Sequence, residues 1–183
     1  MKIILIGGEP ATGKSTIVKK IKGKTKFFKI TRFTNNVNKT IIFEVNDNKK
    51  LIILGHYLGD LNDGTDKMDL GIQPAVEDWI IKVLLKKRND YTLLLEGDRL
   101  FNEKFINYIL DNKIDLTIIL LKINDDESIK RHIVRGDKQG DTFLKGRKTK
   151  YNNLENIFKC MIYMNNNLSD QIKIINTINE LIK

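Results

Sequence analysis

The sequence contains very little cysteine, histidine or proline. Its single cysteine, Cys160, cannot form an internal disulfide, and with only two histidines the chain cannot build a zinc cluster. Two prolines and twelve glycines exclude a collagen-like repeat and a long linker. Long apolar runs are also missing: residues 3–6 are too few for a signal peptide, and no stretch has the length of a membrane span. We therefore expect a cytoplasmic protein without a membrane partner.

The composition that remains is typical of a globular protein, with 41% hydrophobic and 30% charged residues. A chain of 183 residues can bury a sizeable core in one domain, so we expect residues 1–183 to form a single domain. The net charge is +9. Such a charge attracts nucleic acid or a phosphorylated ligand, but solvated lysines encoded by an AT-rich genome produce the same excess. Charge alone leaves both interpretations open.

Short apolar runs alternate with helical patterns along the chain. Strands are expected at residues 1–6, 27–33, 40–45, 51–54, 91–95, 116–123 and 172–175. Helices are expected at residues 14–22, 74–88, 104–110, 126–135 and 177–183, and within the basic region 142–164. This alternation predicts an α/β sandwich with a mainly parallel sheet. Residues 27–54, with a turn at Asn35-Asn36, look like an antiparallel excursion.

A glycine-rich loop joins the first expected strand to the first expected helix. It reads Gly8-Glu9-Pro10-Ala11-Thr12-Gly13-Lys14-Ser15-Thr16. In this context backbone N–H groups and the helix N-terminus surround a phosphate. Lys14 can reach the β- and γ-phosphates of ATP, and the Ser15 hydroxyl can bind Mg²⁺. The loop therefore predicts a P-loop NTPase fold that binds ATP and Mg²⁺, with the three-layer sandwich of nucleoside monophosphate kinases.

The P-loop does not by itself identify the reaction, because GTPases, motor ATPases and kinases all have one. An Asn-Lys-x-Asp motif, with which GTPases read guanine, is missing from the sequence. One compact domain also leaves no room for a large coupled module, so we expect a small kinase. Such an enzyme needs a second acid for Mg²⁺, a base for the acceptor, and cations that neutralise the transferring phosphoryl group.

Carboxylates follow the expected strand at residues 91–95. The carboxyl end of such a strand faces the ligand crevice of an open α/β sheet. Glu96 or Asp98 can hold Mg²⁺ there, directly or through water, and Arg99 can bind a phosphate or a carboxylate. Strand alternation would point Glu96 and Asp98 to the same side. The alternative is a strand end closed by polar turn residues.

A second group of acids occupies the loop at residues 59–67. One of them can accept the proton of an attacking hydroxyl, and Asp66 is the first candidate and Asp63 the second. The alternative is that these acids are simply solvated.

Residues 131–150 form a basic region that resembles the lid of a small kinase. Arg131 and Arg135 are one helical turn apart and can face one site, and together with Arg147 they can close over the transferring phosphoryl group. The cations from Lys145 to Lys150 can equally follow a nucleic-acid backbone, or form a solvated face.

Several further segments accompany the P-loop in a distinctive order. They are Gly64-Thr65-Asp66-Lys67, Ile72-Gln73-Pro74, Glu96-Gly97-Asp98-Arg99-Leu100-Phe101-Asn102, Thr142-Phe143-Leu144-Lys145-Gly146-Arg147 and Thr149-Lys150. Over about residues 1–155 the chain resembles bacteriophage P-loop kinases described as 5-hydroxymethyluracil DNA kinases. The resemblance implies ATP as the donor, a modified pyrimidine in DNA as the acceptor, and a phage or prophage origin.

Taken together, the residues and the resemblance predict an ATP-dependent kinase that phosphorylates the hydroxyl of 5-hydroxymethyluracil in DNA. A base inside a duplex would have to be flipped out or reached in a single strand. Two other functions remain open. One is a nucleoside, nucleotide or other small-metabolite kinase of the same fold, and the other is an ATP-binding regulator of nucleic acid that transfers nothing.

Overall fold

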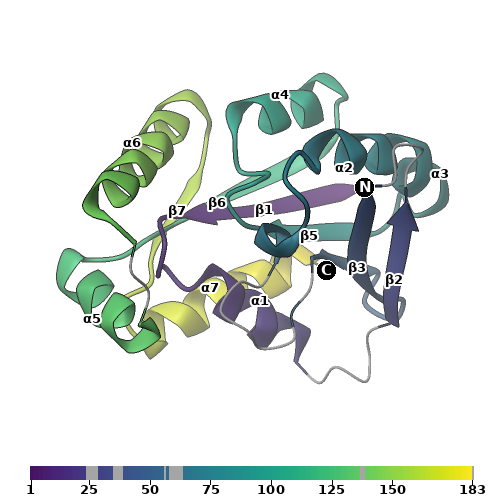
Figure 1. The fold of residues 1–183 in the computed structure, drawn as a ribbon. Coiled ribbons are helices and arrows are strands. Elements are labelled where there is room, and N and C mark those ends of the chain that lie inside the picture. The colour runs from purple at the N-terminus through teal and green to yellow at the C-terminus, as the bar shows by residue number, and fades with distance from the viewer. Residues whose placement is uncertain (24–28, 35–38, 56, 58–63, 137–138, 183) are drawn as a thin grey trace.

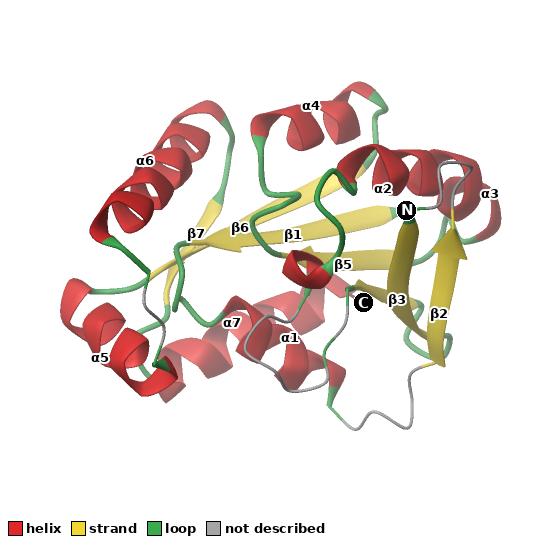
Figure 2. Ribbon diagram, in the orientation of Figure 1, coloured by secondary structure: helices red, strands yellow, loops and turns green. Residues whose placement is uncertain are grey.

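The computed structural model describes residues 1–23, 29–34, 39–55, 57, 64–136 and 139–182. A sheet runs through the molecule and helices cover both of its faces (Figures 1 and 2). The described strands are β1 (Lys2–Gly8), β2 (Lys29–Thr34), β3 (Thr40–Asn46), β4 (Leu51–Leu54), β5 (Thr92–Glu96), β6 (Asp115–Lys122) and β7 (Met161–Met164). The described helices are α1 (Lys14–Lys22), the 3₁₀ turn η2 (Thr65–Lys67), α2 (Gln73–Trp79), the π-helical η3 (Ile80–Leu84), α3 (Leu85–Lys87), α4 (Glu103–Asp111), α5 (Asp125–Arg135), α6 (Asp141–Ile157) and α7 (Leu168–Ile182).

The described strands form one seven-stranded sheet in the order β2-β3-β4-β5-β1-β6-β7. Strands β4, β5, β1, β6 and β7 pair in parallel, whereas β3 is antiparallel to both β2 and β4. The mainly parallel sheet and the antiparallel excursion are therefore confirmed. The turn predicted at Asn35-Asn36 lies outside the described residues.

The central strands β1 and β5 are covered by helices on both sides. Residues 3–6 and 93–95 are fully buried, as their continuous apolar runs predict. One face of the sheet packs against side chains of α2, α4 and α6, and the other against α1 and α7. Because β1 and β5 are parallel neighbours, the loops that follow them leave the sheet at the same edge. This edge carries the P-loop.

The helix expected at residues 74–88 is present as the consecutive segments α2, η3 and α3, and Pro74 lies in its first turn. Its residue Trp79 is fully buried, with its ring 4.5 Å from that of Phe43 on β3. The helix after the P-loop also begins at the predicted Lys14. No helix in the described part of the chain combines the length and hydrophobicity that crossing a bilayer requires.

The C-terminal region differs from the prediction. Residues 172–175 are not a strand but part of α7, which buries Ile174 and Ile178 on one face. The last strand is instead β7, inside the region that was predicted to be helical. The short apolar run that suggested a strand is outweighed by the four-residue spacing of the buried isoleucines. The Asn167 side chain also accepts the Asp170 N–H at 3.0 Å, an N-cap contact that starts the helix.

A buried ion pair joins α1 to β3. Lys22 Nζ lies 2.7 Å from Glu44 Oε2, and the two side chains are only 4% and 2% exposed. Lys22 also donates to the Tyr57 carbonyl at 3.4 Å. The first helix after the P-loop is therefore attached to the sheet by charge as well as by apolar packing.

We expect Lys22→Met to lower the free energy of unfolding by about 3 kcal/mol, because the Glu44 carboxylate is left buried without its partner. The double variant Lys22→Met/Glu44→Leu should recover most of that loss, since no unpaired charge remains. Urea denaturation measures both changes. Lys82→Met, which breaks an exposed ion pair with Asp78, is the matched control and should cost less than about 1 kcal/mol. Equal losses for Lys22→Met and Lys82→Met would contradict the buried pair's role.

Candidate active site

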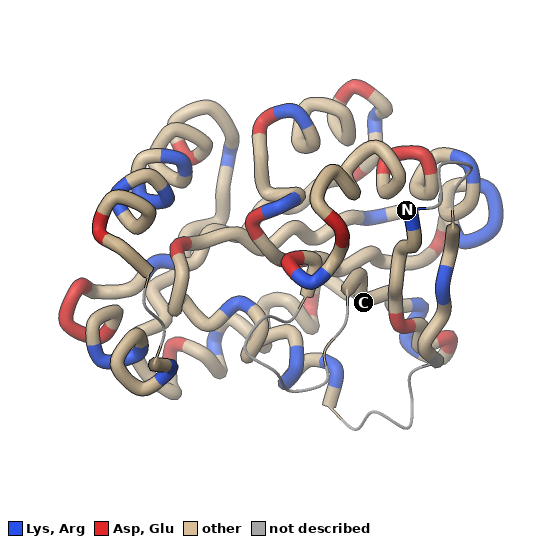
Figure 3. Tube along the Cα trace, in the orientation of Figure 1, with Lys and Arg blue, Asp and Glu red and all other residues tan. Residues whose placement is uncertain are grey.

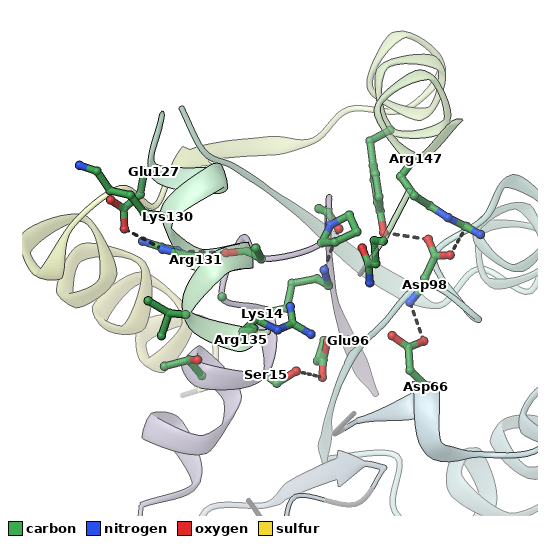
Figure 4. Close-up of a pocket in the computed structure, with 18 of the residues that line it drawn as sticks. Lys14, Ser15, Asp66, Glu96, Asp98, Glu127, Lys130, Arg131, Arg135 and Arg147 are labelled. Carbon is green, nitrogen blue, oxygen red and sulfur yellow. Dashed lines mark hydrogen bonds and ion pairs between the residues drawn. The ribbon is translucent and has the colours of Figure 1, made fainter. Parts of the chain in front are cut away.

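A cavity of about 780 Å³ opens where β1 and β5 end. Its walls come from the P-loop, η2, the end of β5, α5 and α6 (Figure 4). Most of the predicted site residues line it, namely Gly8, Pro10, Ala11, Gly13, Lys14, Ser15, Thr16, Asp66, Glu96, Asp98, Arg131, Arg135 and Arg147. Among the described residues predicted for the site, Glu9, Thr12 and Arg99 do not line this cavity. The structure thus brings together residues from Gly8 to Arg147, which are far apart in the sequence.

The P-loop curls because three of its residues have positive φ angles: Gly8 at 145°, Ala11 at 63° and Gly13 at 86°. At Gly8 a side chain would also collide with β6, since a Cβ would lie 2.5 Å from the Leu121 carbonyl oxygen. Lys14 folds back over the loop and donates to the carbonyls of Gly8 and Glu9 at 2.7 and 3.0 Å. Desolvation lowers the pKa of Lys14, although the negative charge of Glu96 opposes this shift.

Ser15 and Glu96 meet at the floor of the cavity. Ser15 Oγ donates to Glu96 Oε1 at 2.9 Å, and the Tyr57 hydroxyl donates to the same oxygen at 3.3 Å. Burial raises the pKa of Glu96 to about 7, even though Lys14 acts in the opposite direction. A hydroxyl and a carboxylate side by side provide the oxygen ligands that Mg²⁺ prefers.

Asp98 has different neighbours from Glu96. Its carboxylate is paired with Arg147, and it accepts hydrogen bonds from Lys150 Nζ at 2.7 Å and the Tyr151 hydroxyl at 3.0 Å, all on α6. Burial would raise the pKa of Asp98, but the hydrogen bond and charge of Lys150 and the charge of Arg147 lower it below its ordinary value. The expected strand alternation stops at Gly97, whose φ of 118° ends the extended backbone. Of the two acids, therefore, Glu96 contacts the P-loop serine and Asp98 contacts α6.

Asp66 lies on η2 and reaches the end of β5. Its Oδ1 accepts the backbone N–H of Asp98 at 3.0 Å and that of Arg99 at 3.4 Å. The neighbouring Thr65 donates to the Glu96 carbonyl at 2.8 Å, so η2 is attached to this strand end. Asp63, the second candidate for the base, lies outside the described residues.

The prediction that Arg99 binds a phosphate in the site is not supported by its position. Its guanidinium donates to the Met68 carbonyl, and the residue is absent from the described lining of the cavity. The turn that begins at Gly97 directs Arg99 towards the segment after η2. Arg99 therefore attaches that segment to the end of β5.

The two arginines of α5 have different environments. Arg131 donates to the carbonyls of Ala11 at 3.2 Å and Asn165 at 2.7 Å, and to Glu127 at 2.9 Å, so it holds the backbone of the P-loop. Arg135 lines the cavity near Lys14, and its positive charge adds to the desolvation that lowers the pKa of Lys14. Figure 4 shows Arg135 beside Lys14 and Arg131 turned towards Glu127.

Sequence reasoning did not identify Tyr151 or Asn165 as site residues. Tyr151 is one turn before Leu154, and both are buried on α6, a spacing that indicates only core packing. Asn165 follows β7, which was itself not predicted as a strand. Neither residue carries a local motif, so their contacts with Asp98 and Thr12 appear only in the folded chain.

We expect the stability of the protein to depend on pH through Glu96. Its pKa of about 7 in the folded protein exceeds the ordinary value of 4.5, so the folded state binds more protons than the unfolded chain between these values. The free energy of unfolding should therefore fall as the pH rises from 5 to 8, by up to about 3 kcal/mol more than in Glu96→Gln.

Urea denaturation across this pH range measures the difference. The exposed Glu103→Gln serves as the control and should keep the wild-type pH dependence. Parallel curves for wild type and Glu96→Gln would contradict the raised pKa.

Comparison with known proteins agrees with this architecture. No match was found among curated proteins. Among solved structures, a gluconokinase from Sinorhizobium meliloti 1021 aligns over 98% of this chain and 94% of its own, with a TM-score of 0.53 and 9% sequence identity, and this likeness concerns the fold alone. Residues 1–173 match the model of a family described as P-loop Nucleotide Kinase3. The chain, with its P-loop at the edge of a mainly parallel sheet, therefore belongs to the P-loop Nucleotide Kinase3 family.

Proposed function

We propose that the protein is an ATP- and Mg²⁺-dependent kinase that phosphorylates the hydroxyl of a modified pyrimidine, 5-hydroxymethyluracil, in DNA. The observation that supports kinase activity is one cavity lined both by P-loop residues and by residues of η2 and α6, to which we assign the donor and the acceptor side. Lys14 and Ser15 belong to the donor side, and Asp66 and Arg147 belong to the acceptor side. Membership of a P-loop kinase family supports the same reaction class.

On the donor side, the backbone N–H groups of the P-loop bind the β- and γ-phosphates, and Lys14 neutralises part of their charge. Ser15 and Glu96 are the residues that would hold Mg²⁺, which supplies further charge neutralisation on the phosphates when it is bound. Their hydrogen bond of 2.9 Å brings the two oxygen ligands to one point. Arg135, which also lines the cavity, adds positive charge for the transferring group.

On the acceptor side, Asp66 is the proposed base. The acceptor oxygen attacks the γ-phosphorus, the bond from that phosphorus to the oxygen of ADP breaks, and the hydroxyl proton passes to the Asp66 carboxylate. Backbone N–H groups of residues 98 and 99 fix Asp66 Oδ1. Such fixing orients a base before the substrate arrives.

A pyrimidine acceptor is supported by an aromatic side chain in the cavity wall. Phe143 of α6 is 44% exposed, and the guanidinium of Arg147 lies 4.7 Å from the centre of its ring. Exposed aromatic rings beside cations are where unpaired bases stack. The resemblance of residues 1–155 to 5-hydroxymethyluracil DNA kinases points to the same acceptor. Lys145 and Lys148 are exposed on α6, and Figure 3 shows Lys and Arg along this helix.

One observation favours a smaller acceptor. Arg147 and Lys150 both contact Asp98, and Lys148 lies 3.6 Å from Asp125, so three of the four cations between residues 145 and 150 are paired with acids of the protein itself. The alternative function is therefore phosphorylation of a free nucleoside, nucleotide or other small metabolite in the same cavity.

We expect Asp66→Asn to reduce kcat by about 10²- to 10⁴-fold while the affinity for ATP stays unchanged, because the amide cannot accept the hydroxyl proton. Steady-state kinetics and nucleotide titration separate the two quantities. Asp69→Asn, an exposed acid near η2 that pairs with Lys39, is the control and should keep full activity. Normal turnover by Asp66→Asn would exclude Asp66 as the base.

The acceptor is tested by mass spectrometry of DNA containing 5-hydroxymethyluracil after incubation with ATP and Mg²⁺. We expect one added phosphate per modified base with the wild type and none with Lys14→Ala, which lacks the cation at the phosphates. Phosphorylation of free nucleosides or nucleotides without any product on DNA would support the smaller acceptor. No transfer to either, with ATP still bound, would contradict the kinase and leave the nucleic-acid regulator.

If DNA binds along α6, its affinity should fall steeply with salt. Lys145→Ala/Lys148→Ala should then flatten the slope of log affinity against log salt by about 0.9 per lost duplex contact, or about 0.7 on a single strand. Lys86→Ala/Lys87→Ala, which removes the same charge from α3 at the other end of the sheet (Figure 1), should leave the slope unchanged. Equal slopes for both double variants would contradict binding along α6.

A further inference from the structure

The residue after β7, Asn165, has a fully buried side chain that contacts the P-loop. Its Nδ2 donates to the Thr12 carbonyl at 2.7 Å, and the residue has no exposed surface. Its Oδ1 is also buried and has no hydrogen-bond partner among the described residues. A buried carbonyl oxygen without a donor is destabilising, so an apolar side chain would serve packing better here. Packing alone therefore does not account for an asparagine at this position.

The hydrogen bond from Asn165 to the Thr12 carbonyl determines the orientation of one peptide group of the P-loop. The Thr12–Gly13 peptide is trans, so its C=O and N–H point in opposite directions. Because the carbonyl is held by Asn165, the Gly13 N–H points away from Asn165. Gly13 itself lines the cavity. The hydrogen bond thus fixes an N–H donor in the loop that surrounds phosphate.

The same residue is packed tightly against the turn of the loop. A Cβ at position 13 would lie 2.7 Å from Asn165 Nδ2, so the amide fills the space behind Gly13. The backbone of Asn165 is held as well, because its N–H donates to the Lys122 carbonyl at 2.9 Å and its carbonyl accepts from Arg131 at 2.7 Å. Arg131 in turn donates to the Ala11 carbonyl. Two successive carbonyls of the P-loop are therefore held from outside, one by the residue after β7 and one by α5.

The two residues that follow Asn165 extend this junction. Asn166 Oδ1 accepts the N–H of Asn124, the residue just before α5, at 2.9 Å. Asn167 caps α7 through its contact with Asp170. The segment from Asn165 to Asn167 thus connects the P-loop, the start of α5 and the start of α7. A displacement of Asn165 would affect both the loop and the helix that carries Arg131 and Arg135.

We infer that Asn165 is a positioning residue for nucleotide phosphates: its amide orients the Thr12–Gly13 peptide so that the Gly13 N–H donates to the bound triphosphate. The inference rests on the proposed function only in that the P-loop binds the phosphates of ATP. Asn165 does not touch the nucleotide and takes no part in proton transfer. It acts through the backbone of the loop.

The experiment measures the affinity of the P-loop for ATP and for inorganic tripolyphosphate, by calorimetry. Asn165→Leu keeps the branched shape of the side chain and removes both its donor and its unpartnered oxygen, and Asn165→Ala removes both groups together with most of the side-chain volume. We expect both variants to bind both probes about tenfold or more weakly than the wild type, because the Gly13 donor is no longer fixed. Asn46→Ala is the control, since Asn46 is also buried and hydrogen-bonded but lies at the end of β3.

A role in stability alone predicts another pattern. Asn165→Ala and Asn46→Ala would then lower the midpoint of thermal unfolding and leave both affinities at the wild-type value, which would overturn the inference while the wild type still binds ATP. Asn165→Leu keeps the test valid if Asn165→Ala does not fold. Failure of the wild type to bind either probe would overturn the proposed function and the inference together. If the Asn165 variants bind ATP weakly but bind tripolyphosphate as the wild type does, the inference is also overturned, because the substitution would then affect contacts with the nucleoside and not with the phosphates.

Discussion

The parallel pairing of β1 with β5 is the constraint on which the rest of the site depends. Ile6 is directly opposite Glu96 in this pairing, and neighbouring strands are separated by about 4.8 Å. The P-loop and the second acid therefore start from adjacent points of one sheet edge, and the Ser15–Glu96 hydrogen bond closes the remaining gap. Both strands are buried on both faces, so this register cannot slip without moving apolar side chains into the wrong layer. The relative positions of the P-loop and Glu96 are thus fixed by the hydrophobic core beneath them.

The proposed acceptor side is assembled by the residues that follow the same strand. The Asp98 carboxylate contacts two cations and a tyrosine of α6, while the backbone N–H groups after Gly97 donate hydrogen bonds to Asp66. One short turn therefore attaches both the lid-like helix and η2 to the sheet. Only glycine fits at this turn, because a Cβ at position 97 would lie 2.4 Å from Thr65 Oγ1. The proposed donor and acceptor groups are consequently attached to the end of the same strand, although they come from four separate segments of the chain.

The sequence predicted the parts of this protein in which local pattern and tertiary structure agree. The P-loop, β1, β5 and α1 were recognised because apolar runs and a glycine-rich turn leave few other conformations, and Lys14, Ser15, Asp66 and Glu96 were found in one cavity. The helix expected at residues 177–183 lies within α7, but residues 172–175 were mispredicted because they fit a strand or a buried helix equally well in isolation. The position of Arg99 could not be predicted for another reason: the direction of a side chain after a glycine with positive φ depends on the turn. Asn165 could not be found at all, since its partner is 153 residues away.

The ion pairs of Asp98 affect which anions can bind beside it in the cavity. Arg147 and Lys150 are already matched by an internal carboxylate, so the proposed acceptor half of the cavity holds an anion of its own. An inorganic phosphate or sulfate ion has to displace that carboxylate and gains little in exchange. A phosphoryl group delivered on a nucleotide is held by many other contacts, so it can compete with Asp98 at high effective concentration. Asp98 thus competes with free anions for Arg147 and Lys150.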